Sequence, residues 1–513
     1  MKKNAKLFVT AAIALTSIVL SSCAKKEKGI TYTLLWNTKI EKVGNNLVVE
    51  KGKKGEPTTI YKKVNGEIRD DLKVLVFTDL HLDHNQDCCN YTFTMIAKNI
   101  KNVKPDLVVL CGDNITSIEQ KPRARQFAKM MEDMDVYWSF VLGNHEGKEY
   151  PVKDMMSRPE HVKFFTQYSH CLIEPSIKHT DDGTEVWGNG NHAINILNSK
   201  KEVAQTFFFL DSGDKMSDED WKTNYATEVQ AFIDMGRADE DEVEFYDYIK
   251  DSQLKWYKET MAKYPSSNAT IFSHVPLKDM EDAYLEYYYR YNHQSSEPIW
   301  EDDQGPYKNE VIWPYTEVTG AVKDCNVKIR IGHRAEGMCY GPHDIRDNPI
   351  YEPGPETSLT NHTAVFKTMV ESGGKHPAFF CGHDHQNNFV IDEKVGDKTV
   401  TMGYIQPAGY SSNNFYTKGM LTEDPLSEPD KYHLIQGYSI MDLDLTNSSY
   451  PFSINHYTNY DVWNHEHYVE GLQLIRDILL NKTTPKDYAP AYNKYISDPN
   501  DPLKGINPPT QLA

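Results

Sequence analysis

The stretch Val74-Leu75-Val76-Phe77-Thr78-Asp79-Leu80-His81 decides the fold, because in it an apolar run gives way to an Asp-x-His fragment. A short apolar run of this kind, rich in β-branched residues and followed by polar ones, is typical of a buried strand. Four more polar fragments follow apolar runs in the same way: Gly112-Asp113-Asn114, Gly143-Asn144-His145-Glu146, Ser273-His274 and Gly382-His383-Asp384-His385. Residue types that bind metals therefore recur at the ends of predicted strands.

These strand ends are expected to bring their side chains together at one site. The sheet behind a strand end fixes its position, and metal coordination needs that precision. The fragments supply two Asp, one Asn and three to four His, with no paired Cys, and this set favours Zn, Mn or Fe over ions that prefer thiolates. Seven ligands are too many for one tetrahedral ion, but they suit two ions about 3.5 to 4 Å apart that share a carboxylate. The sequence therefore predicts two divalent or trivalent ions of Fe, Mn or Zn.

In order and spacing, the five fragments resemble the calcineurin-like metallophosphoesterase superfamily, whose pattern is D-x-H, G-D, G-N-H-D/E, H and G-H-x-H. The resemblance spans roughly residues 71–440. It implies seven metal ligands: Asp79, His81 and His385 at the first ion, Asp113 between the ions, and Asn144, His274 and His383 at the second. It also implies that a hydroxide between the ions attacks phosphorus. His145 then protonates the leaving oxygen, a step typically worth about 10²- to 10⁴-fold.

Longer runs resemble the purple-acid-phosphatase-like branch of that superfamily. The last fragment continues to residue 389 in the pattern G-H-D-H-x-N-x-F, and three other segments look like their counterparts in the branch: 210–213, 252–256 and 273–277. Two departures argue against better-known branches. True purple acid phosphatases carry a Tyr three positions after the second-fragment Asp and lack the first-fragment His, whereas this chain has Thr116 and His81. Protein phosphatases of the calcineurin type follow Gly-Asp with x-x-D-R-G, which this chain does not have.

Helical segments separate the fragments. Residues 92–103, 126–134 and 251–263 are predicted as helices, 206–210 as a strand, and 389–454 as rich in strands. The first three fragments stand 34 and 31 positions apart, about the length of one βαβ unit, so parallel pairing is expected near the site. The fold class is α/β. The resemblance implies a two-sheet β-sandwich flanked by helices in α-β-β-α layers.

Three residues near the fragments are candidates for contacts behind the ligands or with a substrate. Glu146 is expected either to orient His145 or to cap the next turn. Asn191 and His192 lie in a Gly-rich turn, residues 188–192, that resembles a family segment near the pocket, and either is a candidate substrate contact.

An aromatic insertion near residues 281–315 is the predicted source of specificity. It is crowded with aromatic residues: Tyr284, Tyr287, Tyr288, Tyr289, Tyr291, Trp300, Trp313 and Tyr315. A long aromatic loop over a rigid site is a candidate for recognising a base, a sugar or another leaving group. The alternative is a loop that packs against itself.

The first residues read as a targeting segment. Lys2, Lys3 and Lys6 precede an apolar stretch, residues 7–20, that is too short to span a bilayer comfortably. The following Leu20-Ser21-Ser22-Cys23 resembles the lipobox of bacterial lipoproteins, in which the Cys carries the lipid. We expect an exported protein, lipid-anchored through Cys23 to the bacterial cell envelope at its periplasmic face or surface; the alternative is an ordinary secretory signal.

The expected domain order follows from these segments. Residues 1–22 are a lipoprotein signal peptide, 23–70 a tether and N-terminal β segment, 71–455 the metallophosphoesterase domain, and 456–513 a C-terminal helix (469–480) with a Pro-rich tail. The 39% hydrophobic content is enough for a sizeable core. The formal net charge of −19 disfavours nucleic acid as a partner, and the lipid is the expected membrane contact.

The sequence as a whole predicts an exported two-metal phosphoesterase that acts on small or exposed phosphate esters. Two alternatives stay open at this point. One is a phosphodiesterase acting on nucleotide- or lipid-headgroup-type diesters, because the same metal pair serves both ester classes. The other is a non-catalytic surface lipoprotein that retains the fold as a binding module. The complete ligand set argues against this second alternative.

Overall fold

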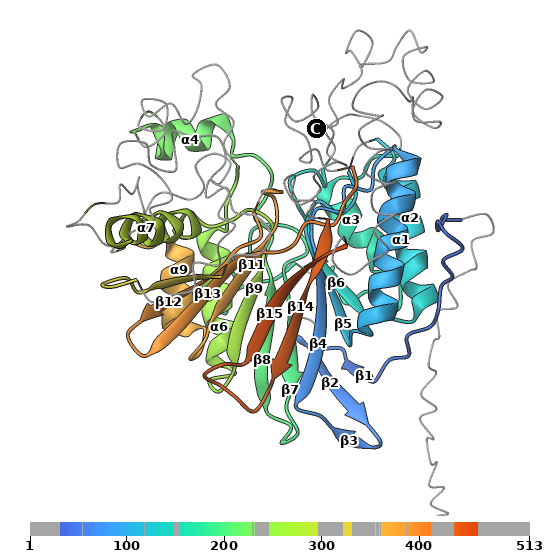
Figure 1. Ribbon diagram of the computed structural model, residues 1–513, viewed down its shortest axis with the longest axis horizontal. Helices are drawn as coiled ribbons and strands as arrows, with labels where there is room; N and C mark the ends of the chain where they lie inside the picture. Colours follow the sequence, from blue (N-terminus) through green and yellow to red (C-terminus); the bar gives the residue numbers. More distant parts are fainter. Residues whose placement is uncertain are drawn as a thin grey trace, which may run out of the picture.

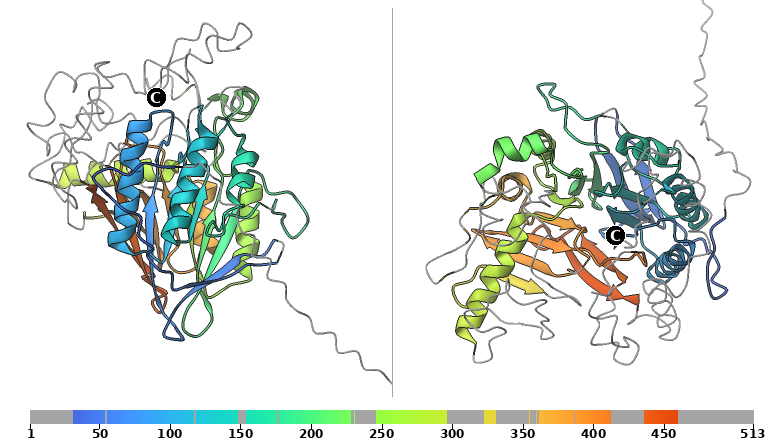
Figure 2. Two further views of the ribbon diagram at one scale, coloured as in Figure 1. Left: turned by 90° about the vertical axis from the view of Figure 1, so that its right-hand side faces the viewer. Right: turned by 90° about the horizontal axis from the view of Figure 1, so that it is seen from above.

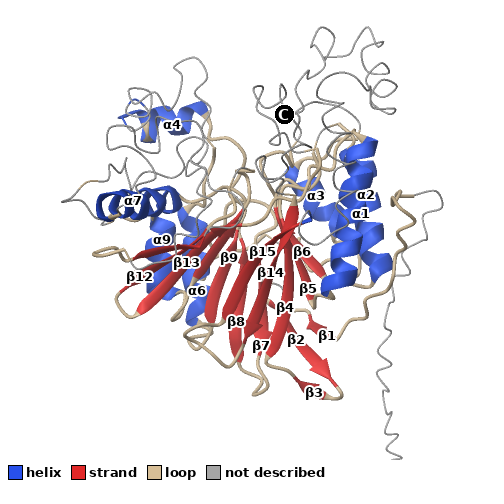
Figure 3. Cartoon of the chain, in the orientation of Figure 1, coloured by secondary structure: helices blue, strands red, loops and turns tan. Residues whose placement is uncertain are grey.

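The computed structural model describes residues 31–459 except for 54, 117, 148–153, 176, 228–229, 231–245, 296–321, 331–353, 355–358, 360, 386 and 412–435. Two sheets pack face to face, and helices cover the outer face of each (Figure 1, Figure 3). Viewed from above, the two helical layers lie on opposite sides of the paired sheets (Figure 2). The predicted α/β fold with α-β-β-α layers is confirmed.

The smaller sheet has five strands within the described residues and carries the first three polar fragments. Its order is β15-β14-β4-β5-β6, and β4, β5 and β6 are parallel. Its strands are β4 (Asp71–Phe77), β5 (Leu107–Cys111), β6 (Trp138–Val141), β14 (Gly437–Asp444) and β15 (Phe452–Thr458). Each parallel strand ends directly before or within two residues of its fragment, as the apolar runs predicted.

The larger sheet has ten strands within the described part of the chain, and its central strands carry the last two fragments. Its order is β1-β2-β7-β8-β9-β11-β13-β12-β10, with β3 paired to β2. The strands are β1 (Leu47–Glu50), β2 (Thr58–Val64), β3 (Glu67–Ile68), β7 (His192–Leu197), β8 (Val203–Phe209), β9 (Asn268–Phe272), β10 (Val327–Arg330), β11 (Ala378–Cys381), β12 (Val390–Val395) and β13 (Lys398–Tyr404). Because β8, β9 and β11 are parallel, the fragments that follow β9 and β11 lie at one edge.

Helices cover the two outer faces. The smaller sheet is covered by α1 (Gln86–Val103), α2 (Gln120–Met134) and α3 (Arg158–Phe165), and the larger one by α6 (Asp251–Ala262), α7 (Lys278–Gln294) and α9 (Ala364–Ser372); α4 (Asp218–Asn224) lies apart from both layers (Figure 1). The predicted helices at 92–103 and 126–134 are real but begin six residues earlier. In α1 the reason is an N-cap, because the Asn85 side chain accepts a hydrogen bond from the Cys88 N–H at 3.2 Å.

Strand alternation divides the core into three apolar layers. Val74 and Val76 of β4 face the layer between the sheets, whereas Leu75 and Phe77 face α1 and α2. In β8, Phe208 packs toward the outer helices while its two neighbours fill the space between the sheets. Strands buried on both faces read as unbroken apolar runs, which is why the sequence showed runs and not alternation.

The aromatic insertion contains a helix where a long loop was predicted. Tyr284, Tyr287 and Tyr288 lie on α7 and are buried against β10, β12 and α9 within the outer core layer. The expectation that they recognise a leaving group is wrong, because no more than 1% of each side chain is exposed. Trp300, Trp313 and Tyr315 lie outside the described residues.

The predicted terminal segments also lie outside the described residues, namely the signal segment, Cys23 and the helix at 469–480. In the part of the chain that the structure describes, no helix is both long enough and apolar enough to cross a membrane. The N-terminal strands β1 and β2 join the edge of the larger sheet.

Candidate metal centre

Backbone hydrogen bonds join four of the five polar fragments in pairs. The Asp79 N–H donates to the Gly112 carbonyl at 3.0 Å, the His81 N–H to the Asp113 carbonyl at 2.9 Å, and the Gly382 N–H to the His274 carbonyl at 3.1 Å. Asp79, His81, Asp113 and His383 all adopt positive φ, a conformation that costs a non-glycine residue free energy and that clusters at functional sites. The loop backbone is thus held in a strained shape that aims these side chains inward.

The first group of predicted ligands converges on one point. One ligand atom each from Asp79, His81, Asp113 and His385 lies within 4.8 Å of the other three, and all four residues are buried. Nε2 of His385 lies 3.0 Å from Nε2 of His81 and 3.1 Å from Oδ1 of Asp79. Imidazole nitrogens and carboxylate oxygens at this spacing can hold one metal ion.

The second group shares Asp113 with the first. Oδ1 of Asn144 lies 2.9 Å from Nε2 of His274 and 3.0 Å from Nδ1 of His383. Nε2 of His274 lies 3.3 Å from Oδ2 of Asp113, and the same Asp113 oxygen lies 3.6 Å from Nε2 of His81. Asp113 therefore stands between the two groups, where the sequence predicted a bridging carboxylate. The structure brings all seven predicted ligands together.

The hydrogen bonding of His274 tests whether this site fits a cation. Its Nδ1 lies 2.8 Å from the Cys111 carbonyl, which only accepts, so Nδ1 carries a proton. In the neutral ring Nε2 then has a lone pair, yet it faces Asn144 Oδ1 and Asp113 Oδ2, which also have lone pairs. A positive charge between these three acceptors satisfies all of them. The site therefore fits metal ions, with a second proton on His274 as the substitute in their absence.

The carboxylates and histidines of the cluster shift one another's pKa values. Burial alone lowers the pKa of His274, but the carboxylates of Asp113 and Asp79 outweigh it and raise that pKa to about 9. Burial alone would raise the pKa values of Asp79 and Asp113. The surrounding histidines outweigh burial and hold both pKa values well below the usual value. The pKa of His81 is lowered, chiefly by burial. The two carboxylates are ionised and need a counter-charge.

Close approach explains the glycines that precede the ligands. A Cβ on Gly143 would lie 2.1 Å from Oδ1 of Asp113, and a Cβ on Gly382 would lie 1.8 Å from Oγ1 of Thr78 and 2.5 Å from Oδ2 of Asp79. Any other residue at these positions would displace a carboxylate of the cluster. The G-N-H and G-H-x-H spacing thus has a steric basis.

His145, the predicted acid, lies at the solvent side of the cluster. Its side chain is 32% exposed, and its Nε2 lies 3.9 Å from Oδ2 of Asp113. Its backbone N–H donates to Oδ1 of Asp113 at 2.9 Å, which fixes the loop position. Its ring centroid is 5.4 Å from that of His81. The imidazole is therefore accessible to a substrate and close to the predicted ligands.

Glu146 acts on the backbone of the loops that carry Asp113 and His145. Its buried carboxylate accepts backbone hydrogen bonds from Gly143 at 2.5 Å, Asp113 at 3.0 Å, Asn114 at 2.5 Å and Ile115 at 2.9 Å. It joins the loop after β5 to the loop after β6, and so it fixes Asp113 relative to Asn144. Burial and the charge of Asp113 raise its pKa, while the backbone donors lower it.

The expected substrate contacts of Asn191 and His192 are wrong. His192 is fully buried between the sheets, where its Nε2 bonds Ser139 Oγ at 2.6 Å, its ring stacks on Phe209, and burial lowers its pKa to about 3. Asn191 is 4% exposed, and its Oδ1 accepts hydrogen bonds from the Asp211 N–H at 3.0 Å and Gln253 Nε2 at 2.9 Å. Both residues support the frame behind the site.

Two supporting residues were missed by the sequence reasoning. Nη1 of Arg158 donates to the Gly143 carbonyl at 2.5 Å, and Nη2 pairs with Asp211. Nε2 of Gln120 donates to the Gly147 carbonyl at 3.1 Å. Both residues fix the His145 loop from helices, and no motif marks either of them. Residues 210–213, which include Asp211, stand out in the sequence only through their resemblance to the purple-acid-phosphatase-like branch.

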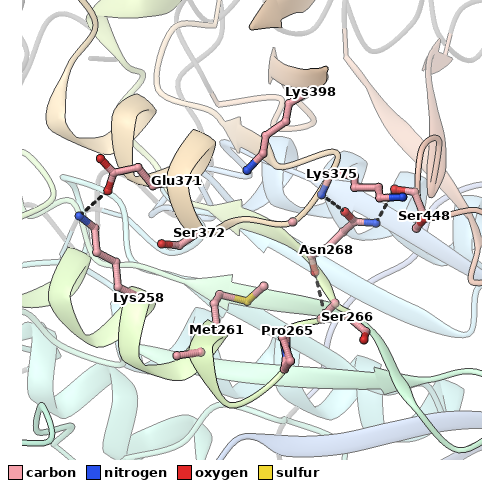
Figure 4. A pocket seen from close by; sticks show the side chains of 13 residues that line it. Lys258, Met261, Pro265, Ser266, Asn268, Glu371, Ser372, Lys375, Lys398 and Ser448 are labelled. Atoms are coloured by element: carbon pink, nitrogen blue, oxygen red, sulfur yellow. Dashed lines mark hydrogen bonds and ion pairs between the residues drawn. The ribbon is translucent and has the colours of Figure 1, made fainter. Parts of the chain in front are cut away.

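A cavity lies at the opposite end of the larger sheet. It has a volume of about 710 Å³ and is lined by residues next to the first residues of β9 and β11, whose other ends carry the metal fragments. Figure 4 shows the Lys258 side chain pointing at Glu371, and their ion pair measures 2.8 Å. Lys398 donates to the Val370 carbonyl. Two of the lysines that line this cavity are thus engaged within the protein.

A two-sheet sandwich with a buried Asp/His cluster at the strand ends defines the class of metallophosphoesterases. The model of the family described as calcineurin-like phosphoesterase matches residues 72–387, which is more than half of the chain. The chain therefore belongs to the calcineurin-like phosphoesterase family, as its five fragments predicted.

Two relatives from Arabidopsis thaliana carry the name of the expected branch. The chain is 23% identical over 249 residues to a probable inactive purple acid phosphatase 28, covering 42% of this chain and 56% of the relative. It is 24% identical over 223 residues to a probable inactive purple acid phosphatase 29, covering 39% and 49%. The chain thus spans about half the length of the curated relatives it matches. The word "inactive" in both names makes retained activity the central question.

Proposed function

We propose that this chain is an active two-metal phosphoesterase that releases phosphate from small or exposed phosphate monoesters. The single observation that carries the proposal is the meeting of all seven predicted ligand side chains around Asp113, with His145 accessible beside them. A family member that had lost activity is expected to have lost at least one of these groups.

One ion would be held by Asp79, His81 and His385. The other would be held by Asn144, His274 and His383, and Asp113 would bind both ions. Bound metal ions supply Lewis acidity toward the phosphoryl oxygens and an activated water as nucleophile. Fe, Mn and Zn all suit this donor set, which lacks thiolates. The ligand roles and the number of two ions belong to the proposal.

His145 would donate a proton from its ring to the leaving oxygen. Three features of the structure support this role. The ring is 32% exposed, it lies beside Asp113 on the solvent side, and the loop that carries it is fixed by Glu146, Arg158 and Gln120. A positioned imidazole of this kind typically contributes about 10²- to 10⁴-fold.

Export and lipid attachment at Cys23 are part of the same proposal, and they rest on the sequence of residues 1–23. Changing Cys23 to Ser in the full-length chain tests the anchor. We expect the protein to move from the membrane fraction to the soluble fraction with its hydrolytic activity unchanged. A Cys23→Ser protein that stays in the membrane fraction refutes the lipid anchor.

The activity is tested by metal analysis together with hydrolysis of p-nitrophenyl phosphate and bis-p-nitrophenyl phosphate. We expect two ions per chain and a preference for the monoester after loading with Mn, Zn or Fe. Asp113→Asn protein, purified in parallel, reports any contaminating phosphatase. A preference for the diester favours the phosphodiesterase alternative. Absence of bound metal and of both activities after loading refutes the enzyme and favours the non-catalytic alternative, in line with the word "inactive" in the names of the two relatives.

A further inference from the structure

A short ribbon outside the five fragments lies against the metal centre. It is formed by residues 214–215, which follow β8, and residues 246–247, which precede α6. The Asp247 N–H donates to the Asp214 carbonyl at 2.9 Å, and Lys215 pairs with Tyr246 in an antiparallel bridge. We call these four residues the side ribbon.

The side ribbon contacts both functional parts of the centre. The ring centroid of Tyr246 lies 4.1 Å from that of His383, at an interplanar angle of 77°. A Cβ on Gly147, two residues after His145, would lie 4.0 Å from Oδ2 of Asp214. The ribbon therefore reaches from a proposed ligand of the second ion to the loop of the proposed acid.

Tight packing holds the side ribbon in place. Gly213, with φ of +81°, precedes it, and a Cβ there would lie 2.8 Å from Cβ of Asp247 and 2.9 Å from Trp187. The segment before Gly213 is held by the Asp211 hydrogen bonds with Asn191 and Arg158. A wall that is fixed in this way can discriminate between substrates, because it cannot move aside at little cost.

Asp214 brings an available negative charge to this wall. Its side chain is half-buried, and among the described residues it makes no hydrogen bond or ion pair. Burial raises the pKa of Asp214 above its usual value. The positive charges of Arg158, Lys215 and His145 act in the opposite direction but do not outweigh burial. Arg158 is committed to Asp211 and the Gly143 carbonyl, so it does not neutralise Asp214 by direct contact.

In a neighbouring part of the same segment, the ammonium group of a lysine already lies against aromatic rings and a carboxylate. Nζ of Lys250 lies 3.4 Å from the Tyr248 ring centroid and 5.3 Å from that of Trp187, and it pairs with Asp247. Aromatic faces combined with a carboxylate are the surroundings in which proteins hold ammonium groups. On the side of the metal centre, the side ribbon supplies the same two kinds of group separately: the Tyr246 ring lies beside His383, and the Asp214 carboxylate lies near Gly147.

We propose that Tyr246 and Asp214 are specificity residues that favour phosphate esters of alcohols bearing an ammonium group and disfavour those bearing a further negative charge. The inference rests on the proposed function for the position of the phosphate at the ions. In that position, the alcohol portion extends past His145 and His383 toward the side ribbon. An ammonium group there meets a ring and a carboxylate, whereas a carboxylate or a second phosphate meets a like charge.

Non-hydrolysable ligands separate this inference from turnover. Calorimetry on the metal-loaded full-length protein compares 2-aminoethylphosphonate, propylphosphonate and 3-phosphonopropionate, which carry a cationic, a neutral and an anionic group. We expect the cationic ligand to bind about 3- to 30-fold more tightly than the anionic one. The ratio of the two dissociation constants is expected to fall toward one in Asp214→Asn and in Tyr246→Leu, and to persist in Tyr246→Phe, which keeps the ring.

Glu371→Gln is the matched control, because it removes the same charge at the opposite end of the larger sheet. It should leave the binding ratio unchanged. Equal or tighter binding of the anionic ligand by the wild-type protein, an unchanged ratio in Asp214→Asn, or no binding of any of the three ligands overturns the inference. If the binding preference holds while hydrolysis is absent, the proposed function fails and the inference stands. If hydrolysis occurs without the binding preference, the inference fails and the proposed function stands.

Discussion

Replacing Glu146 with glutamine tests whether this carboxylate fixes the ligand loops. In the native chain, Oε2 accepts from the N–H groups of Gly143 and Asp113, and Oε1 accepts from those of Asn114 and Ile115. Glutamine has nearly the same shape but only one acceptor oxygen. Two of the four backbone donors would therefore face an NH₂ group, whichever way the amide is turned.

The magnitude follows from the number of hydrogen bonds lost. A hydrogen bond to a charged group contributes about 1.5 to 3 kcal/mol, so the loss of two costs about 3 to 6 kcal/mol. A neutral side chain regains part of this, because burying a carboxylate is itself costly, as the raised pKa of Glu146 shows. We expect Glu146→Gln to lower the free energy of unfolding by about 2 to 4 kcal/mol.

Denaturant unfolding of the metal-free and metal-loaded protein measures this effect. Because the loss displaces Asp113 and Asn144, we expect the variant to gain less stability from metal than the wild-type chain gains. Glu371→Gln, an exposed Glu of the same length, is the control. The reasoning is refuted if Glu146→Gln unfolds at the same denaturant concentration as this control and binds metal with the wild-type stoichiometry.

Three other changes test the centre and the fold. Asp113→Asn should lose more metal than any other single ligand variant, because it removes the charge shared by both groups; metal analysis that finds two ions with normal turnover contradicts the bridging role. His145→Ala should keep its metal and slow the hydrolysis of esters with poor leaving groups more than that of activated ones, and equal slowing of both shows that His145 is not the acid. Burial lowers the pKa of His362, but hydrogen bonds with Asp279 and Glu393 outweigh it and raise that pKa to about 9, above about 6.5 in the unfolded chain. The resulting stabilisation is full below about pH 6.5 and is lost as the pH rises through about 9, so the unfolding free energy of His362→Gln should fall less over this range than that of the wild-type chain.

The ligands could be predicted from sequence because each one is tied to a local signal. Every ligand fragment follows an apolar strand, and in three of the five a glycine marks a close approach, so position and chemistry are both visible within a few residues. Parallel pairing then brings the strand ends to one edge without further information. The same locality explains why the helices were found but began too late, since the N-cap at Asn85 lies among the residues of the first fragment's loop.

The residues around the ligands could not be predicted, because their partners come from distant parts of the chain. Three of the four donors to Glu146 lie more than 30 positions away, and only the pairing of β5 with β6 brings them there. His192 looked exposed in a Gly-rich turn, yet the order of the larger sheet turns it toward Ser139 of the other sheet. Tyr246 and Asp214 have no motif, and only the side ribbon brings their two segments together.

The arrangement of charge connects the acidic chain with an anionic substrate. With a formal net charge of −19, the surface as a whole repels a phosphate ester. Two divalent ions at the cluster would carry more positive charge than Asp79 and Asp113 neutralise, so the centre would become a local attractor within an acidic body. Asp214 brings the opposite sign next to the loop that carries His145. Under the two proposals, an ester with phosphate at one end and an ammonium group at the other would match both charges in a single orientation, which we expect to place its bridging oxygen beside His145.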